Sequence, residues 1–126
     1  MSQTTIRAVA LGALMAAGFA IAPKAATAME KIDDRAAFMA TLGGRSLNIR
    51  LYGLELRVLD DGRIIGRAAG RDVSGAWTWE AGYFCRSMMW GAREIPYNCQ
   101  EVRAEGDRMR FTSDRGTGDT AVFGLR

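Results

Sequence analysis

The stretch GAWTWEAGYFCR, residues 75–86, decides the fold that the sequence predicts. Its first half alternates in the period of an extended strand, which places Trp77 and Trp79 on one face. Gly82 then marks a turn, and a second apolar segment carries Cys85. The stretch therefore predicts two consecutive antiparallel strands that share an aromatic face.

The same period continues on both sides of this stretch, in short segments separated by glycine turns. Besides the strand that carries Trp77 and Trp79, the predicted strands are LNIRL (47–51), LELRV (54–58), RIIGRA (63–68), YFCRSMMW (83–90), NCQEVRA (98–104), RMRFTS (108–113) and TAVFGLR (120–126). One helix is predicted at DDRAAFMATLGG, residues 33–44, because Asp33 or Asp34 can cap it and Gly43 ends it. The fold class is mainly β: a small antiparallel meander closed as a seven- or eight-stranded barrel or a tight sandwich, with one short N-terminal helix and one disulfide.

The two cysteines, Cys85 and Cys99, are expected to form that disulfide. A hairpin centred on Ala92 places them opposite each other, and at least one tryptophan is expected to pack beside the bridge. The same register pairs Ser87 with Tyr97, Met89 with Ile95, and Arg86 with Asn98. A bridge closing this loop contributes about 3 kcal/mol on the chain-entropy estimate, which is a large share for a small domain.

Residues 1–28 are predicted to be a secretory signal peptide. Arg7 provides the positive start, residues 8–22 form an apolar run of 15, and ATA ends the segment as a small-residue cleavage site. The run is shorter than the roughly 20 residues that span a bilayer, although an uncleaved anchor stays open as the alternative. We expect a periplasmic or secreted protein in which residues 29–126 form a single small β domain, with no membrane span after cleavage.

Removal of the signal changes the charge balance, because Arg7 and Lys24 leave and no acid does. The 17 basic residues become 15 against 14 acidic ones, so the net charge falls from +3 to +1. The remaining charges of both signs alternate along the chain, whereas a nucleic-acid interface needs clustered positive charge. We therefore expect no nucleic-acid partner.

Most catalytic chemistry is absent from the composition. The chain has no histidine, so the commonest general base and nearly all zinc sites are excluded, and the paired cysteines leave no thiolate. We expect no catalytic residue, no metal ligand and no cofactor. The remaining enzymatic alternative is a carboxylate-dependent hydrolase that uses Asp114 and Asp119, which flank RGTG; loop oxygens there could also bind calcium.

Polar and aromatic residues near the bridge and the last hairpin form the candidate binding set. They are Tyr83, Arg86, Trp90, Tyr97, Asn98, Gln100, Asp114, Arg115 and Asp119. Because Arg, Tyr and Trp dominate binding hot spots, the set favours a non-enzymatic, inhibitor-like or accessory domain that recognises an unidentified periplasmic protein or cell-envelope component. The structural alternative is that Arg86 only bonds to strand neighbours or to an acid such as Asp114.

A calycin-like binder of small molecules is the second functional hypothesis, with Trp77, Trp79 and Phe111 lining an internal cavity. The interior of so small a barrel is barely wide enough for its own side chains, so burial in the core is the default role of these aromatics. An open apolar pocket of a few hundred Å³ would support the cavity hypothesis, and a filled interior would contradict it.

The combination W-x-W, GYFCR, NCQ and RFTSD-x-G-x-GD resembles a family of short exported alphaproteobacterial proteins, over residues 38–126. That family has no established activity, although its members often carry the label dihydrodipicolinate reductase. Such reductases resemble a Rossmann domain with a Gly-rich loop and a His-His and Lys segment. This chain has no such loop and no histidine, and Lys31 is its only lysine after the signal, so we interpret the label as an error. A looser, architectural similarity is to small periplasmic one-disulfide barrels that inhibit lysozymes or proteases.

Overall fold

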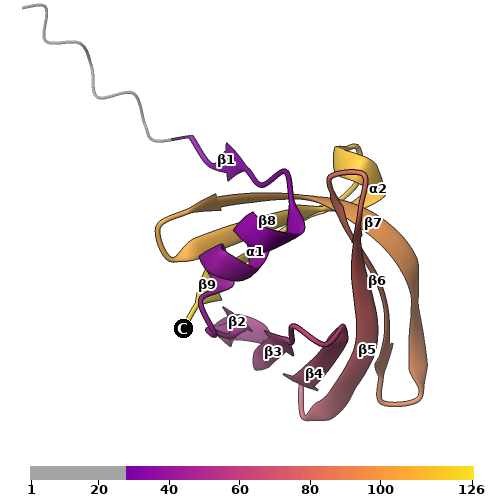
Figure 1. The fold of residues 1–126 in the computed structure, drawn as a ribbon. Helices are drawn as coiled ribbons and strands as arrows, with labels where there is room; N and C mark the ends of the chain where they lie inside the picture. The colour runs from indigo at the N-terminus through magenta and orange to yellow at the C-terminus, as the bar shows by residue number, and fades with distance from the viewer. Residues whose placement is uncertain (1–27) are drawn as a thin grey trace, which may run out of the picture.

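The computed structural model describes residues 28–126, and the predicted signal peptide lies outside these residues except for Ala28 (Figure 1). The elements are β1 (Glu30–Lys31), α1 (Arg35–Leu42), β2 (Leu47–Ile49), η1 (Arg50–Tyr52), β3 (Leu54–Val58), β4 (Arg63–Ala68), β5 (Arg71–Glu80), β6 (Tyr83–Trp90), β7 (Arg93–Glu105), β8 (Arg108–Thr112), α2 (Ser113–Gly116) and β9 (Thr120–Leu125). Neither helix of this part of the chain is long and apolar enough to cross a membrane.

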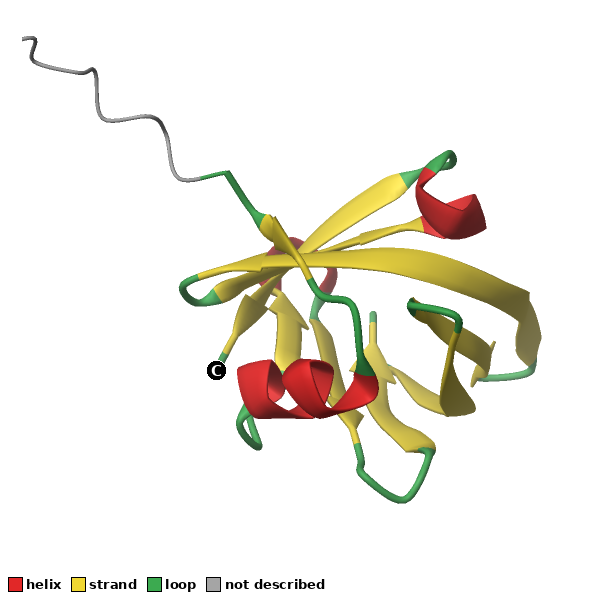
Figure 2. Ribbon diagram, turned by 45° about the horizontal axis from the view of Figure 1, so that its top comes forward, coloured by secondary structure: helices red, strands yellow, loops and turns green. Residues whose placement is uncertain are grey.

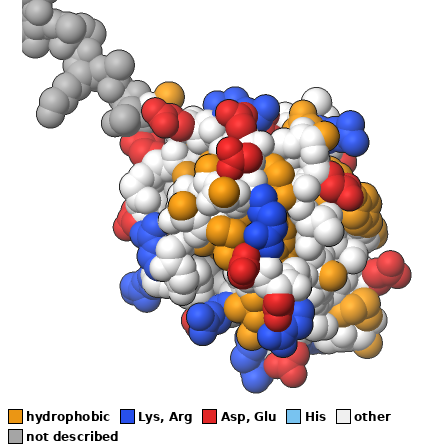
Figure 3. All heavy atoms as spheres, in the orientation of Figure 1, with side chains coloured by type: hydrophobic (Ala, Val, Ile, Leu, Met, Phe, Trp, Pro, Cys, Tyr) orange, Lys and Arg blue, Asp and Glu red, His pale blue; other side chains and the backbone are white. Residues whose placement is uncertain are grey.

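Strands β2 to β9 form a closed antiparallel barrel of eight strands, as predicted. Each pairs with the next in sequence, and the pairing of β2 with β9 closes the ring. The short β1 pairs with Arg103 and Ala104 of β7. These residues follow Gln100, where the pairing of β7 with β6 ends. In Figures 1 and 2, α1 lies at one open end of the ring of strands, apart from α2, and Figure 3 shows charged side chains of both signs interspersed over the face presented in Figure 1.

Helix α1 follows the predicted caps. The carboxylate of Asp34 accepts a hydrogen bond of 2.8 Å from the amide of Ala37, and Gly43 ends the helix in the left-handed region with φ of 56°. Phe38 and Leu42, one turn apart, are fully buried and face the barrel interior. The helix therefore fills one side of the barrel with apolar side chains.

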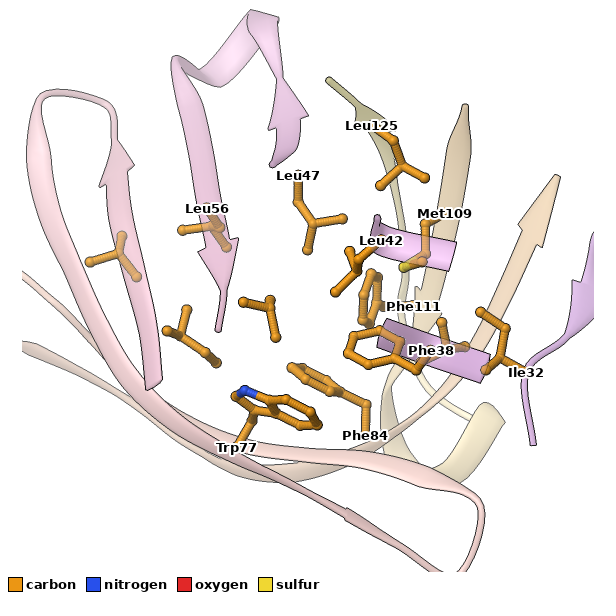
Figure 4. Packing of buried hydrophobic residues seen from close by; sticks show 14 residues of the cluster. Ile32, Phe38, Leu42, Leu47, Leu56, Trp77, Phe84, Met109, Phe111 and Leu125 are labelled. Atoms are coloured by element: carbon orange, nitrogen blue, oxygen red, sulfur yellow. The ribbon is translucent and has the colours of Figure 1, made fainter. Parts of the chain in front are cut away.

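An aromatic cluster joins α1 to the strands (Figure 4). The ring of Phe38 lies 5.5 Å from that of Trp77, 5.2 Å from Trp79, 5.2 Å from Phe84 and 6.3 Å from Phe111. Both indole N–H groups donate to backbone carbonyls, so neither tryptophan leaves an unpaired donor in the core. The opening stretch is thus the centre of the hydrophobic core.

The disulfide prediction is confirmed. Cys85 and Cys99 pair directly across β6 and β7 and are bridged. The bridge lies on the outer face of the barrel, whereas Trp77 and Trp79 lie on the inner face. The expectation that a tryptophan packs beside the bridge is therefore wrong, and the neighbour of the bridge is the hydroxyl of Tyr97, 3.3 Å from the Sγ of Cys99.

The remainder of the predicted register in this hairpin is only partly right. Arg86 pairs with Asn98 as expected, but the predicted pairs Ser87–Tyr97 and Met89–Ile95 are wrong, because Ile95 pairs with Met88. The register shifts between positions 86 and 88, opposite Pro96, which has no backbone N–H for the ladder. The bulge moves the turn to Gly91 and Ala92 and lets β7 begin at Arg93 instead of the predicted position 98.

Two other chain segments differ from their predicted form. The first strand ends at Ile49, and residues 50–52 form the 3₁₀ turn η1 before Gly53 in the left-handed region. The connection between β8 and β9 contains α2, a single turn in which Asp114 and Arg115 both have φ of 55°. Positive φ is uncommon in residues other than glycine, and no pattern in the sequence predicts it for these two residues.

Candidate functional site

The barrel interior contains a cavity of about 310 Å³. Its wall is formed by Leu47, Leu56, Val58, Ile64, Phe84, Arg86, Met88, Ile95, Gln100, Phe111, Ser113, Asp119, Thr120, Ala121 and Phe123. These residues come from seven strands and from the α2 connection, and no residue of α1 is among them. The helix and the aromatic cluster therefore fill one part of the interior, and the cavity occupies the part toward Ser113 and Asp119.

Two glycines on inward strand positions allow neighbouring strands of the barrel to approach each other closely. By their register Gly66 and Gly75 share the inner face with buried neighbours such as Val73 and Ile64, yet they add no side chain to the interior. A Cβ on Gly66 would clash with the backbone carbonyl of Glu55, and one on Gly75 would lie 2.7 Å from the Cγ of Met88. Glycine at these two positions allows the close strand approach that a tightly curved barrel needs.

Within the described part of the chain, Arg86 is the one cationic side chain on the cavity wall. It follows Cys85 in β6, so its side chain lies on the opposite face of the strand from the disulfide, inside the barrel. Its Nη1 donates a hydrogen bond of 2.8 Å to the carbonyl of Pro96, at the bulge. Arg86 is therefore anchored at one atom, and its guanidinium makes no other hydrogen bond with residues 28–126.

No carboxylate of residues 28–126 forms an ion pair with Arg86. Burial lowers the pKa of its guanidinium, and no neighbouring acid offsets this effect. Arginine nonetheless stays protonated at every physiological pH, so the cavity wall carries a positive charge that is partly removed from water.

Amide and hydroxyl groups extend the polar part of the wall. Gln100 donates to the hydroxyl of Ser113 over 3.3 Å. Asn98 holds the α2 turn in two ways, donating to the Asp114 carboxylate over 2.7 Å and accepting from the Asp114 amide over 2.9 Å. These bonds fix the connection that lies beside the cavity, and those of Asn98 hold Asp114 in its conformation with positive φ.

The two acids considered for hydrolysis have separate environments. Asp114 is bound to Asn98, whereas Asp119 lines the cavity, and both are exposed. Asp119 forms no ion pair with any described residue. Among residues 28–126 it is the only acid on the cavity wall, and its side chain is exposed.

The structure divides the predicted binding set between the two faces of the sheet. Arg86, Gln100 and Asp119 line the cavity, and Asn98 shares the inner face with Arg86 by their direct pairing. Trp90 is also inward and partly buried, with its indole N–H bonded to the carbonyl of Ala68 over 2.7 Å. The outer members are Tyr83, Tyr97 and Arg115.

Those outer residues surround the disulfide. The guanidinium of Arg115 lies 5.6 Å from the ring centre of Tyr83. Tyr97 is 60% exposed and donates to the Glu80 carboxylate over 3.0 Å, which raises the pKa of its phenol. Glu80 and the two cysteines also lie close enough to hold a metal ion, but the disulfide leaves the cysteines no thiolate to offer.

Of the three aromatics predicted to line a cavity, only Phe111 does so. Trp77 is 4% exposed within the core, and Trp79 bonds to the carbonyl of Asp33 at the start of α1. The lining residues that the sequence reasoning missed are mostly Leu, Ile, Val, Met and Phe on inward strand positions. Strand alternation identifies these residues as inward, but only the placement of α1 decides which of them face empty space.

No model of a known family matches the chain, and no curated protein or solved structure matches it. The resemblance to the short exported alphaproteobacterial proteins therefore stays a prediction. The geometry of the barrel cavity carries the functional argument on its own.

Proposed function

We propose that the protein is a non-enzymatic binder that holds a small molecule inside the barrel. The observation that carries this proposal is the cavity of about 310 Å³, with apolar walls and a few converging polar groups from Arg86, Gln100 and Ser113. Ligand sites in proteins combine these features, and their volumes begin at about 300 Å³.

The size of the cavity limits the ligand. At about 30 Å³ for a water-sized group, the space accommodates on the order of ten non-hydrogen atoms. A ligand of this size matches a medium-length alkyl chain or a single substituted aromatic ring. The proposed activity is binding and release, and it includes no chemical step.

We place this activity outside the cytoplasm. The bridge between Cys85 and Cys99 supports an oxidising compartment, in which such bridges persist. The apolar run of residues 8–22 supports export. A ligand present in the periplasm or outside the cell is therefore part of the proposal.

A cavity-filling variant tests the function. Ala121 lines the cavity on β9, opposite Phe111, so Ala121→Leu places extra methyl groups into the space. Isothermal titration calorimetry with octan-1-ol and 3-phenylpropan-1-ol is expected to show binding to the wild-type protein, weakened at least about tenfold in this variant.

The matched control is Ala76→Leu, which adds the same groups on the exposed outer face of β5. It is expected to leave binding unchanged. Circular dichroism confirms that both variants are folded. Equal affinities of the two variants would contradict a site inside the barrel.

The outer face supports a second candidate function, recognition of a protein or cell-envelope partner. Tyr97 is 60% exposed beside the disulfide, together with Tyr83 and Arg115. Capture from a periplasmic extract with wild-type protein and with Tyr97→Ala tests it. A partner retained by the wild type and lost by the variant supports this function, and identical captures contradict it.

A further inference from the structure

We propose that the ligand is a small amphipathic anion, whose oxyanion head group pairs with Arg86 while its apolar body fills the cavity. This inference rests on the proposed binding function and specifies the chemical class of the ligand. A carboxylate is the simplest head group of this class.

The first argument is the state of the guanidinium. It offers five N–H donors, and one hydrogen bond, to the Pro96 carbonyl, is made within residues 28–126. A guanidinium that is partly desolvated without an acidic partner is unfavourable by itself. An anion in the cavity would accept the remaining N–H groups as a planar pair and offset that cost.

The second argument is the order of groups along the wall. Arg86 lies in the middle of β6, between Phe84 and Met88, which share its face and also line the cavity. Ile95 of the neighbouring β7 and Ile64 of β4 extend the apolar wall. A head group on Arg86 therefore places an attached apolar body against hydrophobic side chains.

The third argument is the anchoring of Arg86. Its Nη1 donates a hydrogen bond to the carbonyl of Pro96, which lies at the bulge where the ladder between β6 and β7 is interrupted. The disulfide lies one residue away on the other face of the same strand. The hydrogen bond limits the freedom of the long side chain before binding, and the bridge limits the freedom of the strand that carries it, so less entropy is lost when Arg86 contacts an anion.

Asp119 sets the direction of the ligand. Of the residues that the structure describes, it is the only other charged one on the wall, and it is exposed and forms no ion pair with them. Its carboxylate repels an anion at the solvent side, so the head group is favoured at Arg86 rather than at the entrance. Replacing it with a neutral residue should strengthen anion binding.

Two trios of ligands matched in shape test the charge preference. They are octanoate, octan-1-ol and octylamine, and 3-phenylpropionate, 3-phenylpropan-1-ol and 3-phenylpropylamine. A purely apolar cavity prefers the alcohols, because burial of an unpaired charge is costly. The structure predicts the reverse order, with each carboxylate bound at least about tenfold more tightly than its alcohol at neutral pH.

Variants of Arg86 and Asp119 test whether these residues cause the preference for carboxylates over alcohols. Arg86→Met keeps the length of the side chain and is expected to remove the advantage of the carboxylate, whereas Arg86→Lys should retain part of it. Asp119→Asn leaves Arg86 in place and is expected to raise the affinity for both carboxylates about twofold or more, with no effect on the alcohols.

The outcomes separate the inference from the function on which it rests. If no member of either trio binds, the proposed function fails. If the alcohols bind and the carboxylates bind no better, or if Arg86→Met leaves the ratio unchanged in a folded protein, the function stands and the anion inference is overturned. Tightest binding of the amines would assign the head-group site to Asp119 and would also overturn it.

Discussion

Cys85 and Arg86 are neighbours in β6 whose side chains lie on opposite faces of the barrel wall. The sulfur bridges to Cys99 on the outside, and the guanidinium lines the cavity on the inside. The bridge joins β6 to β7 one residue before the bulge that carries Pro96. The same short segment therefore stabilises the barrel and positions its one internal cation.

Removal of the bridge should lower stability. The double variant Cys85→Ala/Cys99→Ala opens a loop with a sequence separation of 14 residues, and its free energy of unfolding is expected to fall by about 3 kcal/mol. Urea denaturation followed by circular dichroism measures this difference. An unchanged midpoint would show that the bridge does not constrain the unfolded chain as assumed.

The inward glycines should not tolerate a methyl group. In Gly75→Ala the new Cβ meets the carbonyl of Ser87 and the Cγ of Met88, so we expect a loss of about 1–3 kcal/mol. Gly124→Ala is the matched control, because a Cβ there makes only an ordinary contact at 3.8 Å and Gly124 also lies within a strand. Thermal unfolding of the two variants should differ clearly, and equal losses would contradict the close packing at Gly75.

Substitutions at Asp33 and Asp34 should have different effects on stability, because only Asp34 caps α1. Asp34→Ala removes the hydrogen bond to the Ala37 amide and is expected to cost about 1 kcal/mol. Asp33→Ala removes only an exposed contact of 3.9 Å with Lys31 and should cost little. Denaturation midpoints of the two variants test this order of stability losses. A larger loss of stability in Asp33→Ala than in Asp34→Ala would contradict the assignment of Asp34 as the cap.

Tyr97 should ionise above the ordinary tyrosine range. Its hydrogen bond to Glu80 raises the pKa of the phenol in the folded protein, so the stability it contributes is present below about pH 10 and is lost as pH rises through the higher folded value. Absorbance titration at alkaline pH, with Tyr97→Phe to assign the signal, measures this pKa. Glu80→Gln should move it down, and an unchanged value in that variant would exclude Glu80 as the cause.

The sequence predicted the parts of the fold that depend on local chemistry. Alternation placed Trp77 and Trp79 on one inner face, and the cap and stop residues located α1 within two residues at each end. The pairing of Cys85 with Cys99 is also as predicted, although it depends on the bulge, which offsets the turn at Gly91 and Ala92. Alternation and capping are determined by neighbouring residues, so a single sequence contains them.

The cavity depends on relations that the local pattern does not contain. The aromatics Trp77 and Trp79 were candidates for its wall, yet α1 inserts Phe38 against them and the empty space lies elsewhere. The binding set included Arg86, but strand alternation did not show that an arginine would face an open interior rather than solvent. The position of α1 against the barrel decides where the empty space lies, and the bulge at Pro96 affects how Arg86 is held beside it.

Intermolecular nuclear Overhauser effects between bound octanoate and methyl-labelled protein test the central claim most directly. We predict contacts from the alkyl chain to the methyl groups of Ile64, Met88 and Ile95 on the cavity wall. Contacts only to exposed side chains such as Leu51, which is 84% exposed, or no contacts at saturating octanoate, would contradict a ligand site inside the barrel.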